Sequence, residues 1–303
     1  MHLHQHLDLL CRTDRTRALR RLIARVVQPG SRVLDAGCGT GVLSVWAARA
    51  GAAEVVGVDI GDVTLAEQTM RDNGCGEVFS ARRATIEEYC DSPGHGRFDV
   101  VLALLYVNDP RRDEAQSELV LRLRETCLAP GGVMLPDRVH YSAALWEWPG
   151  QDVTARQAQI AARVAGAERE LGLDLRTLRE RLAEAPDLRF FPRRRPSGLL
   201  EMDAARQLGD PVDAFGVDYR SGPAAYPSAV ELAVARPGVA TCVVWTQRLL
   251  CGDEVAYSND SVSWIRNPRR VDAGWLCRVA LDAGWRGSNQ LRLEASPDPS
   301  QPG

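Results

Sequence analysis

The chain has 303 residues, enough for one large domain or two of ordinary size. It is 45% hydrophobic and 25% charged, which is typical of a globular protein with a sizeable core. A net charge of -3 argues against nucleic acid as the main partner, because phosphate-binding surfaces carry a basic excess. No apolar run is long enough to span a bilayer, so we expect no membrane association.

The N-terminus and the cysteines indicate a reducing compartment. The first six residues, M-H-L-H-Q-H, lack the basic and apolar regions of a signal peptide, which predicts a cytoplasmic protein. The eight cysteines are dispersed and none forms C-x-x-C. We therefore expect buried free thiols rather than disulfides or a zinc site, and no bound metal.

The first part of the chain alternates between helix and strand patterns. Residues 7–27 predict one or two amphipathic helices, and Pro29-Gly30 ends them. The elements expected after this break are a strand at 33–35, a glycine-rich turn, a helix at 42–50, a strand at 55–58, a helix at 65–71, a strand at 78–79, a central strand at 98–105, a helix at 113–127 and a final strand after A-P-G-G. This alternation predicts a doubly wound, Rossmann-like α/β domain over residues 1–140.

The second half has a different pattern. Residues 152–185 are rich in Ala, Arg, Leu and Glu and predict a helical insertion. Short β-like segments follow, notably 230–235, 241–250 and 275–281, separated by turn-forming residues. We expect an antiparallel, β-barrel-like domain over 141–295 and a disordered tail over 296–303.

A glycine-rich loop joins the first two strands. Asp35, Gly37, Gly39 and Gly41 form D-x-G-x-G-x-G, and Asp59 closes the second strand. This unit binds nucleoside cofactors, because glycines allow close approach and the second acid accepts hydrogen bonds from ribose hydroxyls. The loop is not the G-x-G-x-x-G of dinucleotide enzymes, and Asp35 would repel a pyrophosphate. An acid at that position suits the ammonium group of S-adenosylmethionine (SAM), although a dinucleotide cofactor stays an alternative.

The loop resembles that of class I SAM-dependent methyltransferases at every motif position. A wider resemblance, to the protein arginine methyltransferases, is densest in three segments, at residues 9–16 (L-L-C-R-T-D-R-T), 33–52 and 128–138. It implies SAM as cofactor, S-adenosylhomocysteine (SAH) as product, and a Rossmann-like domain followed by a β-barrel. It also implies homodimers.

The resemblance assigns further cofactor residues. Arg15 corresponds to the arginine that binds the cofactor carboxylate, and a guanidinium can pair with a carboxylate through two hydrogen bonds. His6 corresponds to the family's histidine nine residues earlier. Ile86 and Glu87 correspond to the adenine-side backbone and acid, and we group Ile60, which follows Asp59, with the cofactor site. Glu87 could equally be a helix-surface charge.

The arginine-recognition residues of the family do not carry over. The first of its two acceptor glutamates corresponds to Leu104, and the second falls near Asp113 or Glu114. The family's T-H-W signature aligns with Ala273-Gly274-Trp275, where the histidine is lost. Leucine in place of glutamate would leave a buried guanidinium unpaired, at a cost of about several kcal/mol. Arginine is therefore not the expected acceptor.

Other side chains are candidates for the acceptor site. Tyr106, Asn108 and Asp109 follow the central strand, at the sheet edge where α/β proteins bind ligands. Tyr106 offers an aromatic face and a hydroxyl that can relay a proton, whereas N-D-P is also good turn chemistry. The aromatic segment Trp146-Glu147-Trp148 is expected at the domain junction, where the tryptophans could line an aromatic pocket or pack in the core or an interface. Leu9 is a further candidate for contact with the acceptor.

These features predict a SAM-dependent methyltransferase that acts on a small aromatic or heteroaromatic metabolite. Bacterial indole C3-methyltransferases, which act on tryptophan-derived substrates, look like one family that fits this prediction. Methylation at nitrogen or oxygen of a similar scaffold stays open. Tyr106 or a neighbouring acid, with Asn108, Asp109 and His6 nearby, would assist proton removal. The alternatives are a protein arginine methyltransferase with a rearranged acceptor loop and a SAM-binding protein without catalysis.

Overall fold

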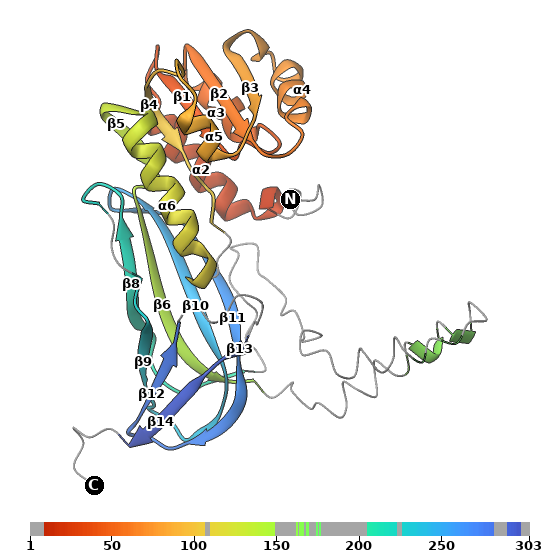
Figure 1. Cartoon of the computed structure of the whole chain (residues 1–303), viewed down its shortest axis with the longest axis vertical. Helices are drawn as coiled ribbons and strands as arrows, with labels where there is room; N and C mark the ends of the chain where they lie inside the picture. Colours follow the sequence, from red (N-terminus) through yellow and green to blue (C-terminus); the bar gives the residue numbers. More distant parts are fainter. Residues whose placement is uncertain are drawn as a thin grey trace.

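The computed structural model describes residues 9–106, 110–148, 205–222, 226–281 and 290–297, with isolated residues between 162 and 176. The molecule is elongated, with a parallel sheet and its helices at one end and long antiparallel strands at the other (Figure 1). Most of the expected helical insertion at 152–185 lies outside the described residues. No described helix is both long and apolar enough to cross a membrane.

The first part is a five-stranded parallel sheet in the order β3-β2-β1-β4-β5. Its strands are β1 (Arg32–Ala36), β2 (Glu54–Asp59), β3 (Phe79–Arg83), β4 (Phe98–Leu102) and β5 (Leu128–Leu135). The helices are α2 (Thr13–Val26), α3 (Val42–Arg49), α4 (Thr64–Asp72), α5 (Ile86–Asp91) and α6 (Pro110–Cys127), with a 3-10 turn at Gly76–Val78. The predicted Rossmann-like domain is confirmed.

The apolar runs form the centre of this sheet because helices cover both of its faces. Four of the five residues of β1 are buried, as are four of five in β4. Helix α2 packs on α3 and α3 on α4, whereas α5 packs on α6. The fully buried Leu19, Leu22 and Ile23 join the core, as their helical spacing predicts.

The second part contains two antiparallel arrangements. One sheet has the order β13-β11-β10-β6-β7, with β8 also paired to β6, and the other has the order β14-β12-β9. The strands are β6 (Arg138–Glu147), β7 (Arg206–Gln207), β8 (Val212–Asp218), β9 (Ala229–Ala233), β10 (Gly238–Cys251), β11 (Glu254–Val271), β12 (Trp275–Ala280), β13 (Gln290–Leu291) and β14 (Leu293–Pro297). This bears out the expected antiparallel second domain.

Two helices of the first part connect it to the second. Helix α6 lies beside β6 in Figure 1, and Asp113 and Ser117 on this helix make hydrogen bonds to side chains of the β domain. Helix α2 packs on β11, where Arg25 pairs with Glu254 at 2.7 Å and Arg21 pairs with the same carboxylate. These ion pairs are exposed, so apolar packing and the buried bonds of α6 stabilise the junction more strongly.

Several boundaries differ from the sequence predictions. β3 begins at Phe79 and continues to Arg83, whereas the expected strand ended at Phe79. The central strand ends at Leu102, three residues early. The 18-residue β11 was not predicted because polar residues such as Asn259, Asp260 and Ser261 interrupt its hydrophobic alternation. β14 extends to Pro297, beyond the expected start of the tail at Ser296.

The start of α3 provides a test of the fold. Gly41 has φ +78°, and a Cβ there would lie 3.0 Å from the Cα of Ala66 in α4. We expect Gly41→Ala to lower the free energy of unfolding by about 2–4 kcal/mol, because backbone strain adds to a clash between helices. Gly94→Ala is the matched control, since Gly94 has φ +83° with open space around its Cβ position. Equal urea midpoints for the two variants would contradict this explanation.

Candidate active site

The candidate site lies at the carboxyl edge of the parallel sheet, where the segments after three neighbouring strands meet. β2 lies on one side of β1 and β4 on the other, so the strand order reverses at β1. Asp35 is level with Gly57 in β2 and with Leu102 in β4. The loop after β1, Asp59 after β2 and the segment after β4 therefore meet at the carboxyl edge, where such sheets bind ligands.

The glycine loop is held by the end of β2. The backbone N–H groups of Gly37 and Cys38 both donate to the carbonyl of Val58, at 2.7 and 3.1 Å. Gly37 and Gly39 have positive φ values, and a Cβ at Gly37 would lie 2.9 Å from Leu105. The spacing of the glycines is therefore required by the turn and by the close approach of the segment after β4.

Asp35 lies beneath the loop with 1% of its surface exposed. Ser44 in the first turn of α3 donates to it through its hydroxyl at 2.7 Å. Burial raises the pKa of Asp35 to about 6, the bonds from Ser44 oppose this, and the nearby Asp59 adds to it. This geometry gives Asp35 a role in fixing the loop to α3, and its role toward an ammonium group stays a prediction.

Asp59 is fixed by backbone donors on both sides. One carboxylate oxygen accepts from the N–H of Gly39 at 2.9 Å, and the other accepts from Gly61 at 2.8 Å. Each oxygen retains further lone pairs for ribose hydroxyls. The neighbouring Ile60 is 66% exposed, an unusual exposure for a large apolar side chain. The two residues together offer a hydrogen-bonding group and an apolar surface, as a nucleoside requires.

Arg15 provides the strongest fit to a carboxylate-bearing cofactor. Its guanidinium carbon lies 5.1 Å from the ring centroid of Tyr257 on β11, and its buried Nε has no hydrogen-bond partner among the described residues. Burial lowers the pKa of Arg15 from its ordinary value, and Tyr257 opposes that shift. A ligand carboxylate would supply the acceptor that this buried Nε lacks.

The other cofactor candidates are placed less directly. Ile86 begins α5 with its side chain buried in the core, so only its backbone can face a ligand. Glu87 is exposed. Thr85 caps this helix reciprocally with Glu88, which explains the T-I-E-E sequence as a helix start. The capping role accounts for Glu88 and leaves Glu87 as the candidate acid.

The acceptor-side candidates lie only partly within the described residues. Asn108, Asp109 and His6 fall outside them. Leu104 and Tyr106 are half-buried and pack against the core of the first part. The Tyr106 hydroxyl is buried and has no hydrogen-bond partner in the described part of the chain. An unpaired buried hydroxyl is available to a substrate or to a proton, as the prediction for Tyr106 requires.

Asp113 has a different role from a free acid. It is fully buried at the start of α6, and one oxygen accepts from the Tyr141 hydroxyl at 2.6 Å and from Gln247 Nε2 at 2.8 Å. Burial and then the charge of Asp113 raise the pKa of Tyr141 well above its ordinary value. Sequence reasoning missed Tyr141 and Gln247, because polar residues stand on both sides of each (H-Y-S and T-Q-R) and no local pattern distinguishes them from surface positions of a strand.

Two predicted parts of the site lie elsewhere. Trp146 is eight residues along β6 from Arg138, about 27 Å away. It packs with Trp148, Cys242 and Trp264, and Glu147 bonds Arg206 at 3.0 Å. The assignment of Trp146, Glu147 and Trp148 to a substrate site at the domain junction is therefore wrong, because β6 carries them to the opposite end of the β domain.

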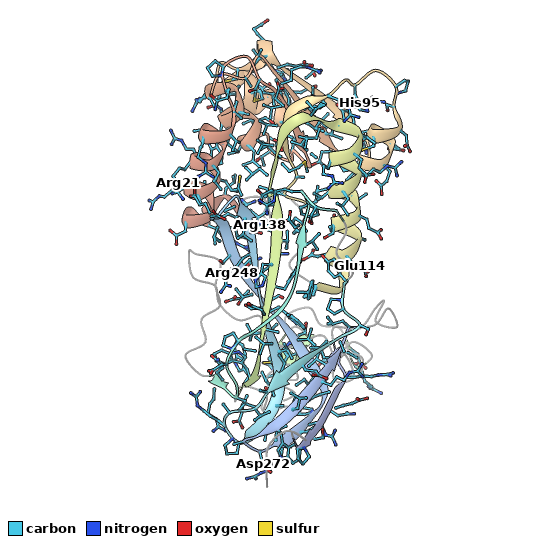
Figure 2. The ribbon with its side chains drawn as sticks, turned by 90° about the vertical axis from the view of Figure 1, so that its left-hand side faces the viewer. Arg21, His95, Glu114, Arg138, Arg248 and Asp272 are labelled. Atoms are coloured by element: carbon cyan, nitrogen blue, oxygen red, sulfur yellow. The ribbon has the colours of Figure 1, made fainter. Side chains whose placement is uncertain are left out.

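The turn compared with the T-H-W signature also lies far from the parallel sheet. Gly274 follows Asp272, which Figure 2 places at the end of the molecule opposite His95. The Gly274 N–H bonds the carbonyl of Val234 in a turn. The comparison of Ala273-Gly274-Trp275 with that signature therefore says nothing about the acceptor site. Leu9 is helical and half-buried, and its predicted contact with an acceptor stays untested.

Known proteins resemble this chain mostly through its first half. The family described as Ribosomal protein L11 methyltransferase (PrmA) matches residues 15–107. Protein arginine N-methyltransferase 1 of Dictyostelium discoideum is 33% identical over 146 residues, which are 45% of this chain and 40% of the relative. The ubiquinone biosynthesis O-methyltransferase of Hahella chejuensis is 43% identical over 89 residues, 28% of this chain and 37% of the relative. The chain thus spans less than half the length of these curated relatives.

The similarity of fold covers nearly the whole chain. The structure titled Trypanosoma brucei PRMT1 enzyme-prozyme heterotetrameric complex with AdoHcy has a TM-score of 0.62 at 21% identity, covering 92% of this chain and 88% of that one. The two-part architecture is therefore that of the arginine methyltransferases. The sequence and fold together make the Rossmann-like part a class I SAM-dependent methyltransferase domain with SAM as its cofactor.

Asp35 generates a pH test. Because its pKa is higher in the folded chain than the unfolded value of about 4, the charged form opposes folding. Its stabilising contribution is complete below pH of about 4 and is lost as the pH rises through about 6. Relative to Asp35→Asn, the wild type should lose about 2–3 kcal/mol of unfolding free energy over this range.

Urea unfolding of both proteins between pH 4 and 8 measures this difference. Ser44→Ala should enlarge the loss, because Ser44 favours the charged form of Asp35. Parallel stability curves for the wild type and Asp35→Asn would contradict a raised pKa of Asp35 in the folded chain.

Proposed function

We propose that this chain, whose first part is a class I SAM-dependent methyltransferase domain, methylates a small aromatic or heteroaromatic acceptor. The observation that carries the proposal is the combination of a buried, unpartnered Tyr106 hydroxyl with an apolar side chain at Leu104. An acceptor beside these groups would meet an apolar wall and one polar hydroxyl. That environment suits a neutral ring better than a cation.

The chain's residues would divide the reaction between binding and proton handling. Arg15 would bind the cofactor carboxylate, Asp59 the ribose and Ile60 the adenine face. When bound, SAM supplies an electrophilic methyl group, and SAH leaves as the carbon–sulfur bond breaks. Rate enhancement would come mainly from holding the acceptor close and in line in a water-excluded site. Tyr106 would accept or relay the proton that the acceptor loses.

Methylation of protein arginine is the second candidate. The names of several similar proteins favour it, including the Dictyostelium relative. Two features oppose it: Leu104 stands where the family resemblance calls for a glutamate, and the nearby Asp113 already accepts bonds from Tyr141 and Gln247. The similarity to a ubiquinone O-methyltransferase supports a small acceptor. By analogy with the oligomeric trypanosomal neighbour, we also propose that this chain self-associates.

The assignment of Arg15 predicts a specific loss of cofactor affinity. Arg15→Gln should weaken SAH binding about 10- to 100-fold in calorimetry, because a charge-assisted bond contributes about 1.5–3 kcal/mol. Arg17→Gln is the matched control, since Arg17 is exposed on the same helix, and its SAH affinity should equal that of the wild type. Equal affinities for both variants would remove Arg15 from the cofactor site.

The acceptor class is tested with methyl-labelled SAM. We expect label to enter indole or phenol compounds and not arginine-rich peptides. Tyr106→Phe should lower kcat on the best acceptor about 100-fold while SAH affinity stays unchanged, because the variant removes a proton-transfer group and keeps the ring. Incorporation into the peptides alone would establish the second candidate. Full turnover by Tyr106→Phe would exclude Tyr106 as the base.

A further inference from the structure

We propose that the acceptor is bound by donating an N–H or O–H hydrogen bond to the side-chain oxygen of Gln247 on β10. This inference rests on the proposed function and specifies it, because it requires an acceptor with a hydrogen-bond donor. The supporting observation is that Gln247 is fully buried and its Oε1 has no partner among the described residues. A buried acceptor left in this state costs about 1–3 kcal/mol, which a ligand donor would recover.

Gln247 belongs to a row of side chains across adjacent strands. Phe215 of β8, Tyr141 of β6, Gln247 of β10 and Asn259 of β11 are direct register partners in turn. Direct partners in antiparallel strands project to the same face of the sheet. Helix α6 covers one part of this row, because its Asp113 bonds Tyr141 and Gln247. At the other side, Arg12 bonds Asn259 at 3.3 Å.

The hydrogen bonds fix which way the Gln247 amide points. Its Nε2 lies 2.8 Å from Asp113 Oδ2 and 2.6 Å from the Tyr141 hydroxyl oxygen. The Tyr141 hydroxyl donates its proton to the same Asp113 oxygen, so its own oxygen can accept from Nε2. A carboxylate can only accept, and a flipped amide would set oxygen against oxygen there. Both Nε2 hydrogens are thus used, and Oε1 remains an acceptor.

The surroundings of Gln247 indicate the class of ligand. Phe215 stacks on Tyr141 with ring centroids 4.6 Å apart, and the ring centroids of Tyr226 and Phe215 are 4.8 Å apart. Ser261, on the same face of β11 two residues beyond Asn259, has a second buried oxygen without a partner in the described residues. An aromatic floor beside an obligate acceptor fits a heteroaromatic ring with an N–H.

The row also lies close to the predicted cofactor end of the site. Tyr257, which carries the Arg15 guanidinium over its ring, is two residues before Asn259 on β11. Alternate residues of a strand are about 7 Å apart. Gln247 is the register partner of Asn259, so it lies about 7 Å along the sheet from the level of Tyr257, where Arg15 would hold the cofactor carboxylate. An acceptor on Gln247 would lie beside the methionine portion of SAM.

The test compares two ligands that differ only in the donor. Indole and 1-methylindole are titrated calorimetrically into the full chain saturated with SAH. We expect the wild type to bind indole about 5- to 150-fold more tightly, the range of one buried acceptor gaining or losing its partner. Gln247→Met keeps the side-chain length and removes the acceptor, so it should bind the two compounds within about twofold.

A further variant controls for the substitution itself. Arg248→Met makes a similar change on the opposite face of β10 and should keep the indole preference. SAH affinity within about twofold of the wild type reports that each variant is folded.

The outcomes distinguish this inference from the proposed function. Equal wild-type affinities for indole and 1-methylindole would overturn the inference, even if aromatic compounds are methylated. Binding of neither compound would also overturn it. An indole preference that persists in Gln247→Met would assign the donor contact to another residue. A Gln247-dependent preference without methyl transfer to any aromatic acceptor would support the inference and overturn the proposed function.

Discussion

The buried carboxylate of Asp113 is the constraint on which the junction of the two parts depends. A carboxylate removed from water is stable only when donors surround it, and two of them here belong to strands of the other domain. Tyr141 and Gln247 must therefore face α6, which fixes the rotation of this helix relative to the antiparallel sheet. Ser117, one turn further along α6, bonds the hydroxyls of Tyr219 and Tyr226 in the same interface.

This arrangement changes what an acid near the acceptor can do. The family resemblance assigns the second glutamate of an arginine clamp to this part of the chain. A carboxylate oxygen that already accepts two short hydrogen bonds has less capacity for a guanidinium, and Leu104 supplies no second charge. The negative charge at Asp113 thus organises protein donors, and the polar group directed elsewhere is the neutral oxygen of Gln247. The same residues that join the domains therefore define the chemistry of the acceptor.

The cofactor half of the site was predictable because its chemistry is local in sequence. The glycines, Asp35 and Asp59 follow their strands directly, and parallel pairing necessarily brings these strand ends together. The acceptor half depends on long-range register. Gln247, Tyr141 and Asp113 are separated by more than a hundred residues at the widest and meet only because β6 pairs with β10 under α6. Nothing in their local patterns specifies that meeting.

The positions of Trp146 and Trp148 were predicted wrongly for a related reason. An alternating pattern predicts which face of a strand a residue occupies and not which end of the sheet it reaches. β6 leaves the first domain at Arg138, so each residue after it lies farther from the cofactor, and Trp146 reaches the far end. The same ten-residue strand contains Tyr141, which belongs to the proposed site, and Trp146, which does not. Proximity to the cofactor is therefore decided by position along β6, and Tyr141 qualifies because it lies only three residues from the junction.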